Sequence, residues 1–341
     1  MLVHRLLIVD GSSILTTCFF ATVPKEYYYG RTPEEKQAAL SRVMKTSTGI
    51  CVNGVYAAMK SLTKLLSGYK PSHLAVVWDI TRDTFRRRIY PEYKGNRAET
   101  VPELKSQFIL MQEILEDANI QQFMDADLEA DDLIGSLSKQ FEGKLPVYIY
   151  TKDQDCLQLV NDYTRLWLNT NRADELKATY GVTGIPDNVF EFTPYYVKEV
   201  YGLNPIQIID KKALEGDTSD NIPGVRGVGE KAAVPLLQEF GTIEMIYEAL
   251  ESDEQAFKET CKSLGIRSPV KALKEGKESA ILSKNLATIR CKKLEVTLDE
   301  LRLSINEIAL NRQYKRLEFK TLIKPVLETP VIKQAEQGCL F

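Results

Sequence analysis

The sequence predicts an α/β fold in which helices cover a mostly parallel sheet and a helical region follows. Short apolar runs end abruptly in polar or acidic residues, as buried parallel strands do. Between them, apolar residues recur at three- and four-residue spacing, as in amphipathic helices. The strand-like runs are Leu6 to Val9, Leu74 to Trp78 and Pro146 to Tyr150, and the helical stretches are Gly54 to Leu66, Leu104 to Ala118 and Ala130 to Phe141.

Beyond about Thr193 the strand-like runs thin out, and short helices interrupted by Gly and Pro dominate. A chain of 341 residues has room for one large domain or two adjoining ones. We therefore expect a first domain over residues 1–192 and a helical one over 193–324. Residues 325–341, with two prolines and little periodicity, are expected to form a flexible tail.

The composition disfavours several classes of protein. The six cysteines lie far apart without a CxxC pair, so neither a zinc site nor a disulfide framework is indicated. The sequence has no apolar run of about 18 residues, so we expect a cytoplasmic protein without a membrane span. Only His4 and His73 are available, which argues against imidazole-based nucleophilic catalysis. The net charge of −3 conceals segregated acidic and basic segments.

Acidic residues follow all three predicted strands. Because the carboxyl ends of parallel strands share one edge of a sheet, we expect these side chains to converge there. A further acidic segment, LEADD, begins a predicted helix, where residues three apart share a face. The acids concerned are Asp10, Asp79, Asp153 and Asp155 at the strand ends and Glu129, Asp131 and Asp132 in LEADD.

Carboxylates gathered in one cleft repel each other unless cations neutralise them, and oxygen-only ligands favour Mg²⁺ or Mn²⁺. Two such ions, about 4 Å apart, can hydrolyse a phosphodiester. Each acid taken alone could instead be a helix cap or turn residue. The alternative is weaker for the seven acids taken together, because four acidic clusters at corresponding strand or helix ends are hard to obtain by chance.

The segment ALEGDTSDNIPGVRGVGEKAA contains the densest signal in the chain. Its glycines surround a tight turn before a helix that starts near Glu230, and backbone N–H groups at such a turn bind phosphate without reading bases. The turn could also be an ordinary connection between two helices, but two acidic residues upstream of it would then be unexplained. The residues are Gly224, Gly227, Gly229 and Lys231 at the turn and Asp217 and Asp220 upstream, which could reach the acidic cleft.

Two segments are strongly basic. Residues 81–97 have a local net charge of +4 and interleave cations with aromatic rings, which suits a single strand of nucleic acid. Residues 262–293 have a net charge of +7 and could line duplex DNA. A solvated surface is the alternative for both. The first segment contains Arg82, Arg86, Arg87, Arg88, Lys94 and Arg97 with Phe85, Tyr90 and Tyr93.

Six motifs together resemble the 5′ nuclease family, which comprises the 5′-3′ exonuclease domain of bacterial DNA polymerase I and the flap endonucleases. They are IVDGS, VVWD, YPEYKGNR, LEADD, TKDQD and GDTSDNIPGVRGVGEKAA, within residues 1 to 250. The resemblance implies a PIN-like nuclease domain with a helical arch at about residues 81–107 and a helix-hairpin-helix (helix-3-turn-helix) DNA-binding region. It also implies substrates with 5′ flaps, nicks, gaps or 5′ ends, RNA primers among them, in replication or repair at the nucleoid.

The resemblance further assigns roles to individual residues. Lys94 and Arg97 would approach the scissile phosphate with Arg86 as a helper, while Arg87, Arg88, Tyr93, the three hairpin glycines and Lys231 would contact DNA. In several relatives hairpin carbonyls also hold K⁺. Asp10, Asp79, Glu129, Asp131 and Asp132 would surround one divalent ion, and Asp153, Asp155, Asp217 and Asp220 the other.

The chain departs from the family in two respects. It contains an insert, Pro24 to Thr48, to which we assign no function, and we expect a stand-alone form without a polymerase. Its last residues, QGCLF, resemble the QxxLF peptide that binds the bacterial sliding clamp, so Gln337, Leu340 and Phe341 are candidate clamp contacts, with a chance apolar terminus as the alternative. Two other functions stay open: a PIN-type ribonuclease and a branched-DNA-binding protein that does not cut.

Overall fold

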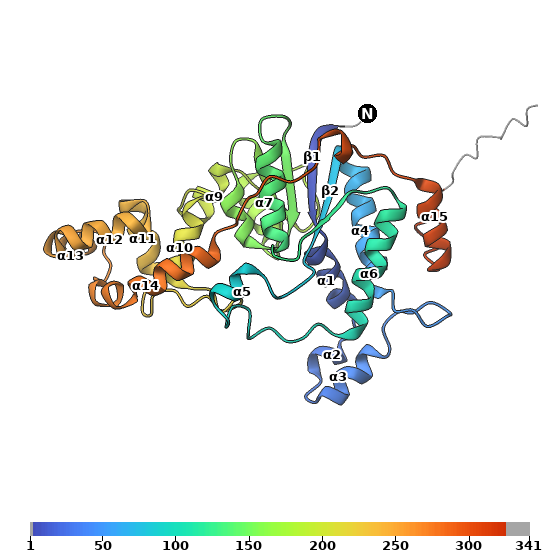
Figure 1. The fold of residues 1–341 in the computed structure, drawn as a ribbon, viewed down its shortest axis with the longest axis horizontal. Helices are drawn as coiled ribbons and strands as arrows, with labels where there is room; N and C mark the ends of the chain where they lie inside the picture. The colour runs from blue at the N-terminus through green and yellow to red at the C-terminus, as the bar shows by residue number, and fades with distance from the viewer. Residues whose placement is uncertain (1–2, 325–341) are drawn as a thin grey trace, which may run out of the picture.

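The computed structural model describes residues 3–324 and places a six-stranded sheet between two layers of helices, with a helical lobe beside them (Figure 1). The strand order is β3-β2-β1-β4-β5-β6. All neighbours pair in parallel except β5 and β6. The strands are β1 Val3–Asp10, β2 Pro71–Trp78, β3 Gln122–Met124, β4 Val147–Thr151, β5 Thr164–Asn169 and β6 Val189–Phe192. The predicted fold class is confirmed.

Each face of the sheet has its own apolar core because the strands bury side chains on both sides. On one face, Trp78 and Phe19 pack with α1, α4, α6 and α15. On the other face, Phe141 and Ile149 pack with α7, the 3-10 helix η1, α8 and α9. These helices are α1 Gly11–Thr22, α4 Asn53–Tyr69, α6 Pro102–Asp117, α15 Glu307–Arg316, α7 Ala130–Phe141, η1 Gln154–Leu159, α8 Ala173–Tyr180 and α9 Pro194–Tyr201.

The helical lobe has a separate core, formed by side chains such as Leu236, Ile246 and Leu273. Helix α5, Phe85–Ile89, lies between this lobe and the sheet (Figure 1). The lobe contains α10 Gln207–Glu215, α11 Glu230–Phe240, α12 Ile243–Ser252, α13 Glu254–Ser263 and α14 Val270–Ala287.

After α14 the chain runs back across α7 and rejoins the sheet (Figure 1). Ile289 and Leu301 enter one sheet core, Leu301 from the short helix η2, Asp299–Leu301. Leu310 and Tyr314 enter the other core from α15. The division at residues 192 and 193 stays a prediction, and this packing favours counting residues 289–322 with the sheet.

The insert forms two short helices, α2 Glu26–Tyr29 and α3 Pro33–Leu40, and a hydrogen bond of 2.8 Å joins Gln37 to Glu103 at the start of α6. Residues 325–341, including the candidate clamp contacts, lie outside the described residues. Within residues 3–324, no helix is long and apolar enough to span a bilayer.

Candidate active site

Two acids at the ends of neighbouring strands meet at one edge of the sheet. Asp10 ends β1, and its carboxylate accepts hydrogen bonds of 2.8 Å from the Ser13 N–H and 2.7 Å from the Thr151 hydroxyl. Asp79 follows β2, and its Oδ1 accepts a bond of 2.8 Å from the N–H of Ala130. These bonds bring the ends of β1, β2 and β4 together with the start of α7.

The turn after β4 adds carboxylates at the same place. Asp153 caps η1 and accepts a hydrogen bond of 2.9 Å from the N–H of Asp155. Asp131 lies in the first turn of α7, and its Oδ1 is 3.5 Å from Sγ of Cys156. The acids of α7 therefore face those that follow β4.

The pKa values of these carboxyls indicate that their charges share one space. Burial, followed by repulsion from Asp79, raises the pKa of Asp10 to about 7. Burial and repulsion from Asp153 raise the pKa of Asp155 to about 7. Burial, then Asp153 and Asp10, raise the pKa of Asp131 well above its ordinary value. A cation bound among these groups would relieve the repulsion.

Lys94 joins the acids of α7 to the hairpin. Its Nζ lies 2.7 Å from Oε2 of Glu129 and 3.7 Å from Oδ2 of Asp220. The Tyr93 hydroxyl donates to the same two carboxylates at 3.2 Å, and Arg97 forms an ion pair with Asp220. Burial would lower the pKa of Lys94, but Glu129, Tyr93 and Asp220 raise it well above its ordinary value. Lys94 is therefore a permanent cation in this cleft.

Lys212 is a site residue that the sequence did not reveal. Its ammonium group forms ion pairs with Asp155 and, at 2.6 Å, with Asp217. Burial would raise the pKa of Asp217, but Lys212 and Ser219 hold it at about 2. The available signal was weak: a lysine five residues before the aspartate, on the helix that leads into it.

The structure thus brings the predicted acids together, with one exception described next. Within residues 3–324, no three His, Cys, Asp or Glu side chains already stand in the arrangement of a metal site. The acids that share the cleft are Asp10, Asp79, Glu129, Asp131, Asp153, Asp155, Asp217 and Asp220.

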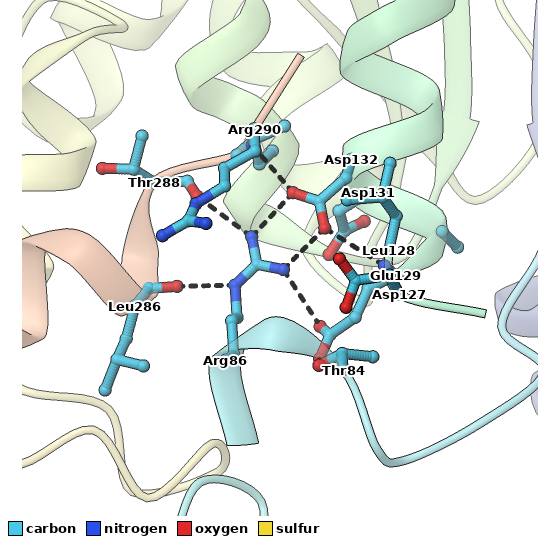
Figure 2. A network of polar contacts seen from close by, with 12 residues as sticks. Thr84, Arg86, Asp127, Leu128, Glu129, Asp131, Asp132, Leu286, Thr288 and Arg290 are labelled. Atoms are coloured by element: carbon cyan, nitrogen blue, oxygen red, sulfur yellow. Dashed lines mark hydrogen bonds and ion pairs between the residues drawn. The ribbon is translucent and has the colours of Figure 1, made fainter. Parts of the chain in front are cut away.

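Asp132 and Arg86 lie apart from the open cleft. They are 0% and 3% exposed, and they pair with each other through two hydrogen bonds of 2.7 and 2.8 Å (Figure 2). The structure therefore buries the Arg86 guanidinium between Asp132 and Glu129, whose Oε2 lies 3.7 Å from Nη1, and does not leave it open to a phosphate. The Asp132 carboxylate is turned toward Arg86 and not toward the other acids.

The hairpin between α10 and α11 combines one buried glycine with two exposed ones. Gly224 has φ +62°, and a Cβ there would lie 2.2 Å from the backbone nitrogen of Gly216, so the turn requires glycine. Gly227 and Gly229 are exposed, and a Cβ at either would meet nothing within 4 Å. Beside them lies a groove of about 1140 Å³, whose charged lining comprises Arg226, Glu230, Lys231, Arg267, Lys271 and Glu275.

The basic segment before α6 is divided between surface and interior. Arg87 is exposed, and Arg88 pairs with Asp127. Tyr93 is 4% exposed, so its ring offers no free face for the base stacking that the sequence suggested. In the second basic segment several cations pair with acids of the lobe: Lys274 with Glu254, Lys277 with Glu251, and Lys284 with Asp210 and Glu244.

Solved structures share this fold. The T5 5′-exonuclease with bound zinc aligns with a TM-score of 0.56 at 22% identity, covering 83% of this chain and 89% of that one. The catalytic core of Rad2 in complex with DNA substrate aligns with a TM-score of 0.53 at 15% identity, covering 95% and 89%. At these identities the likeness concerns the fold.

Curated relatives are more similar in sequence. The DNA polymerase I of Bacillus subtilis is 35% identical over 339 residues, which cover 98% of this chain but 33% of that protein. The chain spans about a third of the length of the DNA polymerase I relatives. A protein named 5′-3′ exonuclease from Halalkalibacterium halodurans is 34% identical over 287 residues, which cover 83% of both chains.

Two family models match nearly the whole described chain. The model described as "5'-3' exonuclease, N-terminal resolvase-like domain" matches residues 5–185. The model described as "5'-3' exonuclease, C-terminal SAM fold" matches residues 203–309. These matches confirm the resemblance carried by the six motifs, and the chain belongs to the 5′-3′ exonuclease family.

Proposed function

We propose that this protein is a divalent-metal-dependent 5′-3′ exonuclease and 5′ flap endonuclease, which hydrolyses phosphodiester bonds near DNA branch points in replication or repair at the nucleoid. The observation that carries the proposal is the convergence of carboxylates at the sheet edge beneath Lys94 and Arg97. The relatives named 5′-3′ exonuclease and DNA polymerase I support it.

The acids fit two Mg²⁺ or Mn²⁺ ions because they supply oxygen ligands alone and raise one another's pKa values. When bound, the ions would supply Lewis acidity toward a water molecule and the leaving oxygen. Lys94 and Lys212 now neutralise acids that would contact the ions. Asp10, Asp79, Glu129 and Asp131 would hold one ion, and Asp153, Asp155, Asp217 and Asp220 the other.

The cations at the cleft would bind the scissile phosphate. Lys94 and Arg97 are held by Glu129 and Asp220 on the side of the cleft that faces the hairpin. Lys94 and Arg97 would stabilise the charge that grows on the phosphate in the transition state. The exposed Arg87 and the cation Arg88 would meet the single strand outside the cleft.

The hairpin would anchor the duplex through its backbone. Gly227 and Gly229 leave N–H groups open to a phosphate at the start of α11, and Lys231 adds positive charge. A K⁺ ion held by hairpin carbonyls belongs to the same proposal. The groove beside the turn leaves room for a phosphate backbone.

The sequence QGCLF would recruit a sliding clamp through Gln337, Leu340 and Phe341. Capture of the chain by purified clamp, and loss of capture when Leu340 and Phe341 are removed, would support this. Equal capture with and without the two residues would contradict it.

The test of the main proposal is cleavage of a 5′-labelled flap oligonucleotide, with nicked and blunt duplexes alongside. We expect release of the flap with Mg²⁺ and none with EDTA. Failure to cut any of these substrates would leave the branched-DNA-binding alternative. Preference for a matched RNA flap over the DNA flap would favour the PIN-type ribonuclease.

A further inference from the structure

A buried ion pair lies behind the cleft. Arg86 belongs to α5, and Asp132 to the first turn of α7. Nη1 of Arg86 is 2.7 Å from Oδ2 of Asp132, and Nη2 is 2.8 Å from Oδ1 (Figure 2). A guanidinium paired with a carboxylate through two parallel bonds fixes the orientation of both groups.

The remaining bonds of Arg86 reach the end of α14. Its Nε donates to the carbonyl of Leu286 at 2.8 Å, and Nη2 donates to the carbonyl of Thr288 at 3.0 Å. Leu286 lies in the last turn of α14, and Thr288 is its C-cap. Arg86 therefore joins three elements from distant parts of the chain: α5, α7 and the end of the helical lobe.

All the acceptor sites of Asp132 are in use. Oδ1 also accepts a bond of 2.7 Å from the N–H of Arg290, and Oδ2 one of 3.1 Å from the N–H of Glu129. A carboxylate offers about four acceptor sites, and these two bonds with the two from Arg86 fill them. The neighbouring Asp131 differs, because it shares its space with charged acids.

The pair is connected to the cleft through Glu129. Nη1 of Arg86 lies 3.7 Å from Oε2 of Glu129, and Asp132 holds the backbone N–H of the same residue. Glu129 in turn binds Lys94 at 2.7 Å. A shift of the pair would therefore move an acid and a cation of the cleft together.

We infer that Arg86 and Asp132 form a positioning strut, which sets Glu129 and Lys94 relative to the other acids and contacts neither metal nor DNA. This inference rests on the proposed function and changes two assignments that the resemblance implies: Asp132 as a ligand of the first ion and Arg86 as a helper at the phosphate.

The strut can be tested without metal or DNA. Arg86→Gln and Asp132→Asn should each lower the Tm of the protein in EDTA by about 5–15 °C, because each leaves an uncompensated buried charge. The Tm of the double variant should be no lower than that of the less stable single variant. The reason is that the first substitution already breaks the ion pair, and the second removes the charge left without a partner. Arg87→Gln, at the exposed neighbouring position, should leave this Tm unchanged.

Manganese binding separates a positioning residue from a ligand. Titration of the free ion, followed by electron paramagnetic resonance, should show the wild-type number of bound Mn²⁺ ions for Asp132→Asn and fewer for Asp131→Asn. On a 5′ flap, both strut variants should cut about 10–100-fold more slowly in single turnover. Their Kd for the flap should stay within about threefold of the wild-type value.

Loss of a Mn²⁺ ion in Asp132→Asn with an unchanged metal-free Tm would make Asp132 a ligand and overturn the inference. Weaker flap binding by Arg86→Gln with an unchanged Tm would make Arg86 a DNA contact and overturn it as well. If the wild-type protein cuts no flap, the proposed function is wrong. The Tm values of the single and double variants and the Mn²⁺ titration still test the positioning strut in that case.

Discussion

The acids that the sequence assigns to one cleft differ in what surrounds them, although they look alike in the sequence. Asp153 is bonded to the N–H of Asp155 and stands among the charged carboxylates. Asp132 is enclosed by four donors. At the scale of the residue, substitution of Asp153 should therefore affect mainly cleavage, whereas substitution of Asp132 should also lower stability.

Asp153→Asn should reduce flap cleavage by at least about 100-fold, because the lost charge belongs to the proposed ion-binding set. DNA binding should be retained, since Asp153 does not contact the phosphates in this proposal. Single-turnover cleavage with Mg²⁺ and fluorescence anisotropy in EDTA measure the two properties. The exposed Asp162→Asn is the matched control, and unaltered turnover in Asp153→Asn would remove Asp153 from the set.

Lys94→Ala should slow the chemical step by about 100-fold and change the Kd for a flap by less than about threefold. The reason is that one cation adds little to binding by a long duplex contact but faces the charge formed at the phosphate. Single-turnover rates at saturating enzyme, compared with binding curves, provide the measurement. A parallel loss of binding and rate would assign Lys94 to substrate binding instead.

The metal-free protein should lose stability as the pH rises from about 4 to about 7, between the unfolded and folded pKa values of two buried carboxyls. The pKa values of Asp10 and Asp155 are raised to about 7 in the folded state, so folding favours their protonated forms. The stability that this protonation contributes is complete below the pKa of the unfolded state. It is lost as the pH rises through the pKa of the folded state. Each group contributes at most about 1.4 kcal/mol per pH unit.

Urea unfolding in EDTA at several pH values measures this dependence, and Asp10→Asn should flatten it. Added Mg²⁺ should restore stability at the high-pH end, because an ion that binds the folded state stabilises it. A profile that is flat in the wild-type protein would contradict the crowding of charges described above.

At the scale of the element, the hairpin separates residues needed for the turn from residues open to a ligand. Gly224 donates its N–H to the Ser283 hydroxyl at 2.9 Å, and its carbonyl accepts from Ser279 at 2.6 Å. These bonds fasten the turn to α14. Gly229 instead caps α11 at the surface.

Gly224→Ala should therefore lower the free energy of unfolding by about 2–4 kcal/mol, through a positive φ and a clash with the backbone of Gly216. Gly229→Ala should change it by less than about 0.5 kcal/mol, because φ is −113° and the space is open. Chemical denaturation measures both values. Equal effects would contradict the distinction.

At the scale of the whole molecule, the chain leaves the sheet for the helical lobe and returns to it. Tyr314 is 1% exposed in the sheet core next to Phe319, although both follow the lobe in sequence. The sheet therefore depends on residues from both ends of the described chain. A division of the protein at residue 193 would separate them.

Tyr314→Ala should destabilise the protein by about 3–5 kcal/mol, as loss of a large buried ring does. Tyr195→Ala, whose ring is 61% exposed, should stay within about 0.5 kcal/mol of the wild-type value. Equilibrium unfolding, followed by tryptophan fluorescence, reports on the sheet because Trp78 and Trp167 lie in it. Similar stabilities for the two variants would mean that residues 289–322 do not support the sheet.

The helices and strands differ in how well the sequence predicted them. Long amphipathic stretches such as Leu104 to Ala118 and uniformly apolar strands such as Leu74 to Trp78 were predicted nearly at their observed bounds. The short edge strands β3 and β6 were not, because three or four residues carry too little periodicity to distinguish a strand from a loop.

The sequence by itself determined the fold class, the family and the gathering of acids at one sheet edge. It could do so because parallel strands align their carboxyl ends, so that Asp10 and Asp79 are neighbours once the strands are recognised. Tertiary structure alone decided that Asp132 faces Arg86, that Lys212 enters the cleft and that Tyr93 is buried. These outcomes depend on contacts between residues tens to hundreds of positions apart, which local spacing does not encode.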